Sequence, residues 1–322
     1  MTRADTAVPG RWRFKGREAV KKYGIMIGFM IISVIIAIIT PNFLSYTNIM
    51  IILRQSSIIG IMAIGATFVI IGGGFDISVG SILALSAAMV LGLQKAMPWG
   101  AALVVTLAAG AFIGLVNGLL SAKVHIVPII TTLGTMTIVR GLTYLYTGGY
   151  PILGYSESFK FIGSGYVWSV PFPILLFLVS VVFWQFVLSK TTIGRYACAV
   201  GGNKESTRLS GISADTYQIL TFVIGGLMAA LAGIVYASRL NSATPLAGQG
   251  YELDAIASTV IGGTSVSGGE GTVVGTLVGV LLLTIISNMF NLLGIQVYVQ
   301  YLIKGIIILA VVGVDSYSKY RK

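Results

Sequence analysis

Long apolar runs alternate with short polar or glycine-rich segments along almost the whole chain. A helix of about 20 apolar residues is long enough to cross the hydrocarbon core of a bilayer. The pattern therefore predicts ten membrane-spanning helices. The eighth run is too short to cross as a regular helix, and we expect it to be tilted, broken or continued into the glycines that follow. The predicted spans are residues 24–40, 49–71, 79–97, 100–122, 128–147, 171–189, 216–238, 252–264, 271–290 and 297–314.

The composition supports the same fold class. Hydrophobic residues make up 56% of the chain, charged residues 10%, and the mean hydropathy is +0.92. Soluble domains carry about 25% charged residues, so this chain has too few charges to cover a surface that faces water. We therefore expect an all-α integral membrane protein with about ten transmembrane helices, in the inner or plasma membrane.

The basic residues that give the net charge of +11 are unevenly distributed along the chain. Basic residues concentrate in the cytoplasmic loops beside membrane spans. With ten spans, fifteen of the 21 basic residues fall on one side and three on the other, which places both termini in the cytoplasm. Nucleic-acid binding is not needed to explain the charge. The cytoplasmic group is Arg3, Arg11, Arg13, Lys15, Arg17, Lys21, Lys22, Lys123, Lys190, Arg195, Lys204, Arg208, Lys319, Arg321 and Lys322.

Short strings recur in the same order in the two halves of the chain. Each half has five predicted spans, and because five is odd, the second half must insert upside down relative to the first. We expect a basic tail over 1–23 and one membrane domain over 24–322, with inverted repeats at 24–165 and 171–315. Chance matching of glycine-rich strings is the alternative. The matches are GIMA (60–63) with GLMA (226–229), GFDIS (74–78) with GYELD (250–254), and GAFIG (110–114) with GTLVG (275–279).

No catalytic, metal or cofactor motif is visible in the sequence. The chain has one histidine and one cysteine, His125 and Cys198, and no phosphate-binding loop. We interpret His125 as an interfacial residue and Cys198 as a packing residue. If the chain takes part in ATP-driven work, the ATPase must be a separate protein.

Two glycine-rich segments, 72–80 and 248–254, interrupt the apolar pattern next to acidic residues. Broken helices of this kind line the solute path in many transporters. For the acidic residues the alternative is capping of a helix start, and for the threonines and asparagines it is helix packing. The candidate path residues are Asp76, Ser78, Thr131, Thr132, Thr135, Arg140, Glu252, Asp254, Asn288 and Asn291.

Residues 190–215 form a polar, basic segment between predicted spans six and seven. It is longer than a simple helix connection, which usually has about 2–8 residues. Within it, ESTRLSG (205–211) predicts a short helix. The segment is either a docking element for a partner protein or a solvated basic loop.

At this point the chain resembles a known family. GRYACAVGGNKESTRLSGI (194–212) is similar to the cytoplasmic coupling segment of ribose/xylose/galactose-type permeases of ATP-binding cassette (ABC) importers, in the branched-chain amino acid/sugar permease superfamily. The resemblance extends over about residues 42–315. It includes GGFDISVGSILAL (73–85), TLGTMTIVRGLTYLYTGG (132–149), GYELDAIASTVIGGTSVSGGEGTVVGT (250–276) and NLLGIQVYVQYLIKGIIILAVVGVD (291–315).

The resemblance implies a permease subunit for a ribose-like monosaccharide, without a nucleotide site of its own. Its partners would be a second permease subunit, identical or paralogous, a cytoplasmic double-cassette ATPase and an extracytoplasmic sugar-binding protein. Glu270 departs from the basic or neutral residue expected there. The resemblance assigns the ATPase-coupling role to Arg195, Gly201, Gly202, Asn203, Glu205, Arg208, Gly211 and Ile212.

Two other functions fit parts of the pattern. An ion-gradient-driven secondary transporter of a small polar solute also has inverted repeats and broken helices. Such transporters typically carry Asp, Glu or His inside the bundle, and these residues are scarce in the predicted spans. A membrane scaffold without transport would account only for the glycine-rich helix packing. The importer permease explains the most features of the sequence.

Overall fold

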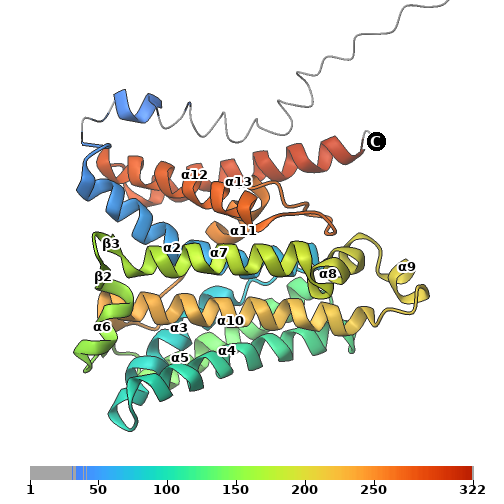
Figure 1. Cartoon of the computed structure of the whole chain (residues 1–322), viewed down its shortest axis with the longest axis horizontal. Helices are drawn as coiled ribbons and strands as arrows, with labels where there is room; N and C mark the ends of the chain where they lie inside the picture. The colour runs from blue at the N-terminus through green and yellow to red at the C-terminus, as the bar shows by residue number, and fades with distance from the viewer. Residues whose placement is uncertain (1–30, 32–33, 39, 41, 321–322) are drawn as a thin grey trace, which may run out of the picture.

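The computed structural model describes residue 31, residues 34–38, residue 40 and residues 42–320. The predicted N-terminal tail (1–23) and most of the first predicted span (24–40) lie outside the described residues. The described part is a bundle of helices, several of which run side by side over most of its length (Figure 1).

Helices occupy the positions that the apolar runs predict for spans two to ten. The helices that match the predicted spans are α2 (Tyr46–Ile71), α3 (Val79–Gly92), α4 (Trp99–Ala122), α5 (Pro128–Thr147), α7 (Phe172–Lys190), α10 (Ala214–Leu240), α11 (Tyr251–Ile261), α12 (Val273–Leu292) and α13 (Val297–Tyr320). Among the described residues, five of these helices (α2, α4, α7, α10 and α12) are long and apolar enough to cross a membrane.

The remaining elements are short and lie at the two ends of the bundle. The helix α6 (Glu157–Ser164) lies at one end, and α8 (Thr192–Gly202) and α9 (Lys204–Leu209) lie at the other (Figure 1). We call these the α6 end and the α9 end. A single 3-10 turn, η1 (Leu93–Lys95), extends α3.

Within the described residues, the chain is mostly helical, as predicted, and adds two small antiparallel ladders. Strand β1 (Ile152–Leu153) pairs with β4 (Ser242–Ala243), and β2 (Tyr166–Val167) pairs with β3 (Val170–Pro171). The apolar pattern predicts neither these ladders nor α6, because two-residue strands and an eight-residue helix are too short to give an apolar run of span length.

The eighth predicted span does not continue into the glycines that follow it. Its helix, α11, ends at Ile261, and the chain then turns at Gly262 and Gly263. Gly263 has a φ of +89°, a conformation that only glycine adopts easily. A non-helical loop, 262–272, then leads to α12.

The helix α10 lies at the centre of the bundle and packs against α2, α3 and α4. Glycines make these contacts close, as the small-residue spacing predicts. Gly110 and Gly114 on α4 face the backbone of α10, where Gly226 lies directly against the carbonyl oxygen of Gly110. On α12, Gly275 and Gly279 pack in the same way against the main chain of α11 and of the turn after it.

Candidate functional site

The starts of two short helices meet inside the bundle. The first, α3, follows the non-helical segment 72–78, and the second, α11, follows a non-helical segment that ends at Gly250. Gly80 in the first turn of α3 lies against the Glu252 carboxylate, and a Cβ atom at this position would lie 2.7 Å from the carbonyl oxygen of Gly248. We call α3 and α11 the half-helices, because each begins within the bundle rather than at its end.

Asp76 lies just before α3 and is buried. Its Oδ1 atom accepts hydrogen bonds from the backbone amide of Ser78 at 2.8 Å and from the Ser78 hydroxyl at 2.5 Å. The Asn117 side-chain amide donates to the same hydroxyl at 2.9 Å, which ties this turn to α4. Among the described residues, Asp76 Oδ2 has no hydrogen-bond partner.

The acidic residues of α11 make two different contacts. Glu252 Oε1 accepts a hydrogen bond of 3.1 Å from the amide of Gly250, while Oε2 has no hydrogen-bond partner in the described part of the chain. Asp254 forms an ion pair with Lys304 on α13, in which the Lys304 amine lies 3.0 Å from each carboxylate oxygen. The Glu252 carboxylate therefore binds the amide of the N-cap residue of α11, as the helix-capping alternative predicts, whereas the Asp254 carboxylate binds Lys304.

Helix α5 bridges the two broken segments. The Thr132 hydroxyl lies 3.2 Å from the carbonyl oxygen of Phe75, in the segment before α3, and 3.0 Å from that of Pro128 in its own helix. Arg140 donates to the carbonyl oxygens of Pro245 and Ala247, at 2.5 and 3.0 Å, in the segment before α11. The same face of α5 therefore holds both segments in position.

Two further threonines of α5, Thr131 and Thr135, are buried. The Thr131 hydroxyl is buried without a hydrogen-bond partner among the described residues.

The two predicted asparagines of α12 make contacts between helices. Asn288 forms a reciprocal pair of amide hydrogen bonds with Asn48 on α2, at 2.8 and 3.0 Å. Asn291 accepts from the Gln300 side chain at 3.0 Å.

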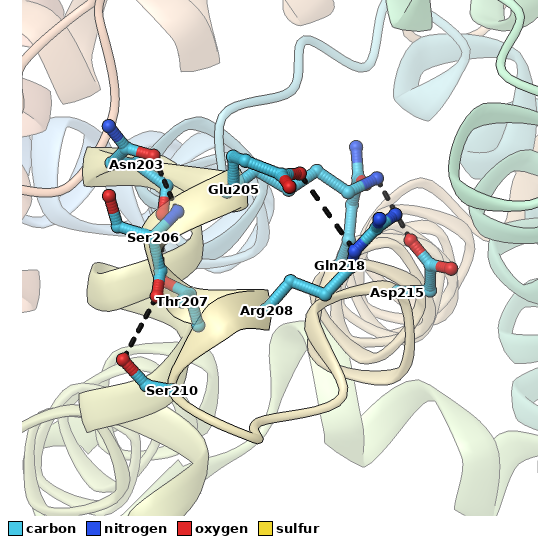
Figure 2. A network of polar contacts seen from close by, with 9 residues as sticks. Asn203, Glu205, Ser206, Thr207, Arg208, Ser210, Asp215 and Gln218 are labelled. Atoms are coloured by element: carbon cyan, nitrogen blue, oxygen red, sulfur yellow. Dashed lines mark hydrogen bonds and ion pairs between the residues drawn. The ribbon is translucent and has the colours of Figure 1, made fainter.

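The central polar segment is more ordered than the sequence predicts. The predicted short helix is present as α9, and it is preceded by the eleven-residue helix α8, which the pattern does not predict. Asn203 caps α9, since its side-chain oxygen accepts a hydrogen bond of 2.8 Å from the amide of Ser206 (Figure 2). Thr207 and Ser210 add further bonds to the main chain of this turn.

Contacts to α10 hold α9 in place. Lys204 donates to the Gln218 side chain at 2.7 Å and pairs with Asp215 at 3.0 Å. Asp215 also pairs with Lys123 at 3.4 Å, which links α10 to the end of α4. The labelled Asp215 and Gln218 lie beside α9 in Figure 2. The sequence gives no sign of this network beyond the presence of the charges.

The outer face of α8 and α9 is exposed. Its exposed members include Leu209, an apolar side chain that is 80% exposed at the tip of α9 and that neither the apolar pattern nor the family resemblance marks as a docking residue. Of the residues selected by resemblance, Gly201 and Ile212 are half-buried, whereas Arg195, Gly202, Asn203, Glu205, Arg208 and Gly211 are exposed. Glu205 and Arg208 form an exposed ion pair at 3.8 Å.

Cys198 lies half-buried on the inner side of α8, and burial raises the pKa of its thiol above the ordinary value. Less of the thiol is then ionised at pH 7, and the thiolate is the form that reacts. We expect the native chain to react with a maleimide about tenfold more slowly than the denatured chain. Since Cys198 is the single cysteine, the label incorporated with time measures this residue alone. Equal rates in both states would show that the thiol is accessible.

The family comparison covers both broken segments and the α8–α9 element. A family described as "Branched-chain amino acid transport system / permease component" matches residues 48–312. The chain belongs to this family. It is a multi-pass membrane protein, and its helices provide the apolar lengths that a permease requires.

The permease is similar to sugar permeases over nearly its whole length. It is 44% identical to the ribose import permease protein of Bacillus subtilis (strain 168), covering 92% of each chain. It is 38% identical to the L-arabinose transport system permease protein of Escherichia coli (strain K12), over 94% of this chain and 92% of that one. Identity to the galactose/methyl galactoside import permease protein of the same strain is 36%, over 94% and 96%. No solved structure gives a significant match.

Proposed function

We propose that this permease forms the membrane pathway of an ATP-driven importer for a ribose-like monosaccharide. The observation that carries the proposal is the 44% identity to a ribose import permease over 92% of both chains. Hydrolysis of ATP is assigned to a separate cytoplasmic ATPase, and delivery of the sugar to an extracytoplasmic binding protein.

We propose ten spans in two inverted repeats, 24–165 and 171–315, with both termini in the cytoplasm. The relation between the two broken helices supports this arrangement. The matching strings at 74–78 and 250–254 lie at the starts of α3 and α11, and these two helix starts meet inside the bundle. The charge bias supports an orientation with the α9 end in the cytoplasm and the α6 end outside.

We propose that the solute passes beside the half-helices and α5. A neutral sugar offers many hydroxyl groups, which need hydrogen-bonding partners rather than a full opposite charge. In the described part of the chain, the Thr131 hydroxyl and one carboxylate oxygen of Glu252 are buried without a hydrogen-bond partner. Arg140, Thr132 and Asp254 hold the surrounding segments through the contacts described above.

A second permease subunit is part of the proposal, and the outer face of α5 supports it. Gly134 and Gly141 lie on that face, and a Cβ atom at either position would meet nothing within 4 Å among the described residues. The apolar side chains of Leu133, Ile138 and Leu145 are exposed beside them. Small residues on an exposed helix face let another helix approach closely in a membrane.

The exposed face of α8–α9 is proposed as the docking surface for the ATPase. The apolar Leu209 side chain provides a point of contact, and the ion pair of Lys204 with Asp215 and its hydrogen bond to Gln218 hold α9 in position. Binding of ATP by the partner would favour one of two conformations of the bundle only if the partner binds α8–α9 differently in each.

Transport by the reconstituted system tests the function. The permease is reconstituted in proteoliposomes with a double-cassette ATPase and a ribose-binding protein from the same source. We expect ribose uptake that requires all three proteins and ATP. Uptake by the permease alone, driven by a proton or sodium gradient without ATP, would instead favour the secondary transporter.

A substitution at Leu209 tests the docking surface. Because Leu209 is 80% exposed, Leu209→Glu removes little packing within the permease. A buried apolar anchor at a protein interface contributes about 2 kcal/mol or more, so we expect binding to the ATPase to weaken at least about tenfold. Leu209→Met keeps the apolar contact and serves as the control. Unchanged ATPase binding by Leu209→Glu would place the docking surface elsewhere.

A further inference from the structure

The end of α8 meets the end of α2 and the 262–272 loop at one point. Gly201 in α8 packs so closely on the carbonyl oxygen of Ile71, the last residue of α2, that a Cβ atom at position 201 would collide with it. The amide of Gly269, in the 262–272 loop, donates a hydrogen bond of 2.9 Å to the same carbonyl oxygen. We call this meeting of Ile71, Gly201 and Gly269 the Gly201 junction.

The Gly201 junction is made by main-chain atoms. A Cβ atom at Gly268 would lie 2.7 Å from the carbonyl oxygen of Gly201, and one at Gly269 would lie 2.9 Å from the Cα atom of Gly202. Gly268 and Gly269 have φ values of +84° and +79°, which favour glycine. Packing this close transmits a displacement instead of absorbing it, because protein interiors have low compressibility.

Both half-helices connect to the Gly201 junction through short segments. From Ile71 the chain runs through 72–78 into α3, and a Cβ atom at Gly73 in that segment would lie 3.4 Å from the Cα atom of Gly201. The 262–272 loop is the direct continuation of α11. Gly262 bonds back to the last turn of α11 through its amide, at 2.9 Å from the carbonyl oxygen of Ser258.

On its other side the Gly201 junction connects to the exposed α9. Only Gly202 and Asn203 separate Gly201 from the first residue of α9, and Asn203 caps that helix. A movement of α9 therefore reaches Gly201 through two consecutive residues. The sequence resemblance groups Gly201 with the ATPase-docking residues, but the structure turns Gly201 toward Ile71, inside the bundle.

We propose that the Gly201 junction transmits movement of α8–α9 to both half-helices at once. Gly201 is then a positioning residue that acts through Ile71 and Gly269 rather than a contact for the ATPase. The inference rests on the proposed function, because it takes ATPase docking as the source of the movement. The α8–α9 element and the half-helices are then physically coupled, and closeness in the structure does not by itself demonstrate coupling. The test must therefore measure how ATP hydrolysis and sugar uptake depend on each other.

An insertion in the 262–272 loop tests the connection on the α11 side. Two residues, Gly-Ser, are inserted between Gly263 and Thr264, where Gly263 is exposed and its added Cβ would meet nothing within 4 Å among the described residues. The insertion lengthens the link from the junction to α11 and leaves α9 and its exposed face unchanged. In the complete complex, we expect ATP hydrolysis to stay within about twofold of the unaltered complex while sugar uptake falls about tenfold or more.

A substitution at the junction itself is the second variant. Gly201→Ala introduces the Cβ atom that collides with Ile71, and the same uncoupling is expected. Gly100→Ala is the control, because Gly100 is a helical glycine of α4 with open space around the added Cβ. Assembly with the ATPase and thermal unfolding in detergent are measured for every variant.

The outcomes separate the inference from the proposed function. Uptake by the insertion variant equal to that of the unaltered complex would overturn the inference alone. So would a fall of uptake and hydrolysis in equal proportion, or a failure of both variants to assemble, since the junction would then serve folding only. If the unaltered complex imports no sugar with ATP, the proposed function is wrong, and the inference is overturned with it.

Discussion

Replacing Lys304 by Met is expected to destabilise the permease by about 3 kcal/mol, because it leaves the Asp254 carboxylate without its partner inside the bundle. The two side chains are 19% and 14% exposed, so water compensates the remaining charge poorly. Thermal unfolding of the purified chain in detergent measures the effect. Lys160→Met is the control, since its ion pair with Glu157 lies on the surface, where such pairs contribute about 1 kcal/mol or less.

The double variant Lys304→Met with Asp254→Asn separates the charge from the side-chain shape. Removing both charges leaves no unpaired ion, so we expect the double variant to be more stable than Lys304→Met alone. The pair joins α11 to α13, so its loss also loosens a half-helix that we propose lines the pathway. Equal stability of the Lys304→Met variant and the unaltered protein would show that the Asp254 charge does not need Lys304 to compensate it inside the bundle.

Gly226→Ala is expected to destabilise the permease by about 1–3 kcal/mol, the range seen when extra methyl groups are forced into a packed core. The added Cβ atom would collide with the carbonyl oxygen of Gly110, so α4 and α10 would have to separate. This contact lies at the centre of the bundle, where no side chain can rotate to make room. Thermal unfolding in detergent again gives the measurement.

Gly100→Ala is the matched control for Gly226→Ala. Both glycines are helical, but an added Cβ at Gly100 meets nothing within 4 Å in the described part of the chain. Alanine favours helix by about 1 kcal/mol over glycine, so Gly100→Ala should be neutral or slightly stabilising. A similar loss of stability in both variants would contradict the packing explanation and indicate a general intolerance of substitution.

The sequence alone determines the positions of the long helices. The prediction of a helix over 128–147 coincides with α5, and the other long helices begin and end within a few residues of their apolar runs, apart from the far end of α13. The physical reason is local. A bilayer requires a continuous apolar stretch with all main-chain hydrogen bonds satisfied within the helix, so hydropathy along the chain carries the signal.

The sequence also locates the two places where helices are broken. Glycines next to acidic residues mark 72–80 and 248–254, and the structure has non-helical backbone over 72–78 and up to Gly250, directly before α3 and α11. The sequence pattern does not predict the helix α8, which is also rich in glycine. Its three glycines, Gly194, Gly201 and Gly202, have low intrinsic helix propensity, and packing against the bundle stabilises the helix instead.

Only the tertiary structure decides which polar groups meet. Nothing in the local pattern pairs Asp254 with Lys304, directs Arg140 to the carbonyl oxygens before α11, or brings Gly201 against Ile71. These contacts join residues that are 50 to 130 positions apart, and they depend on how the helices pack. The sequence therefore determines the membrane fold class and the places where its helices break, because both depend on local composition. The contacts of the proposed pathway and of the α8–α9 element arise from packing across the bundle.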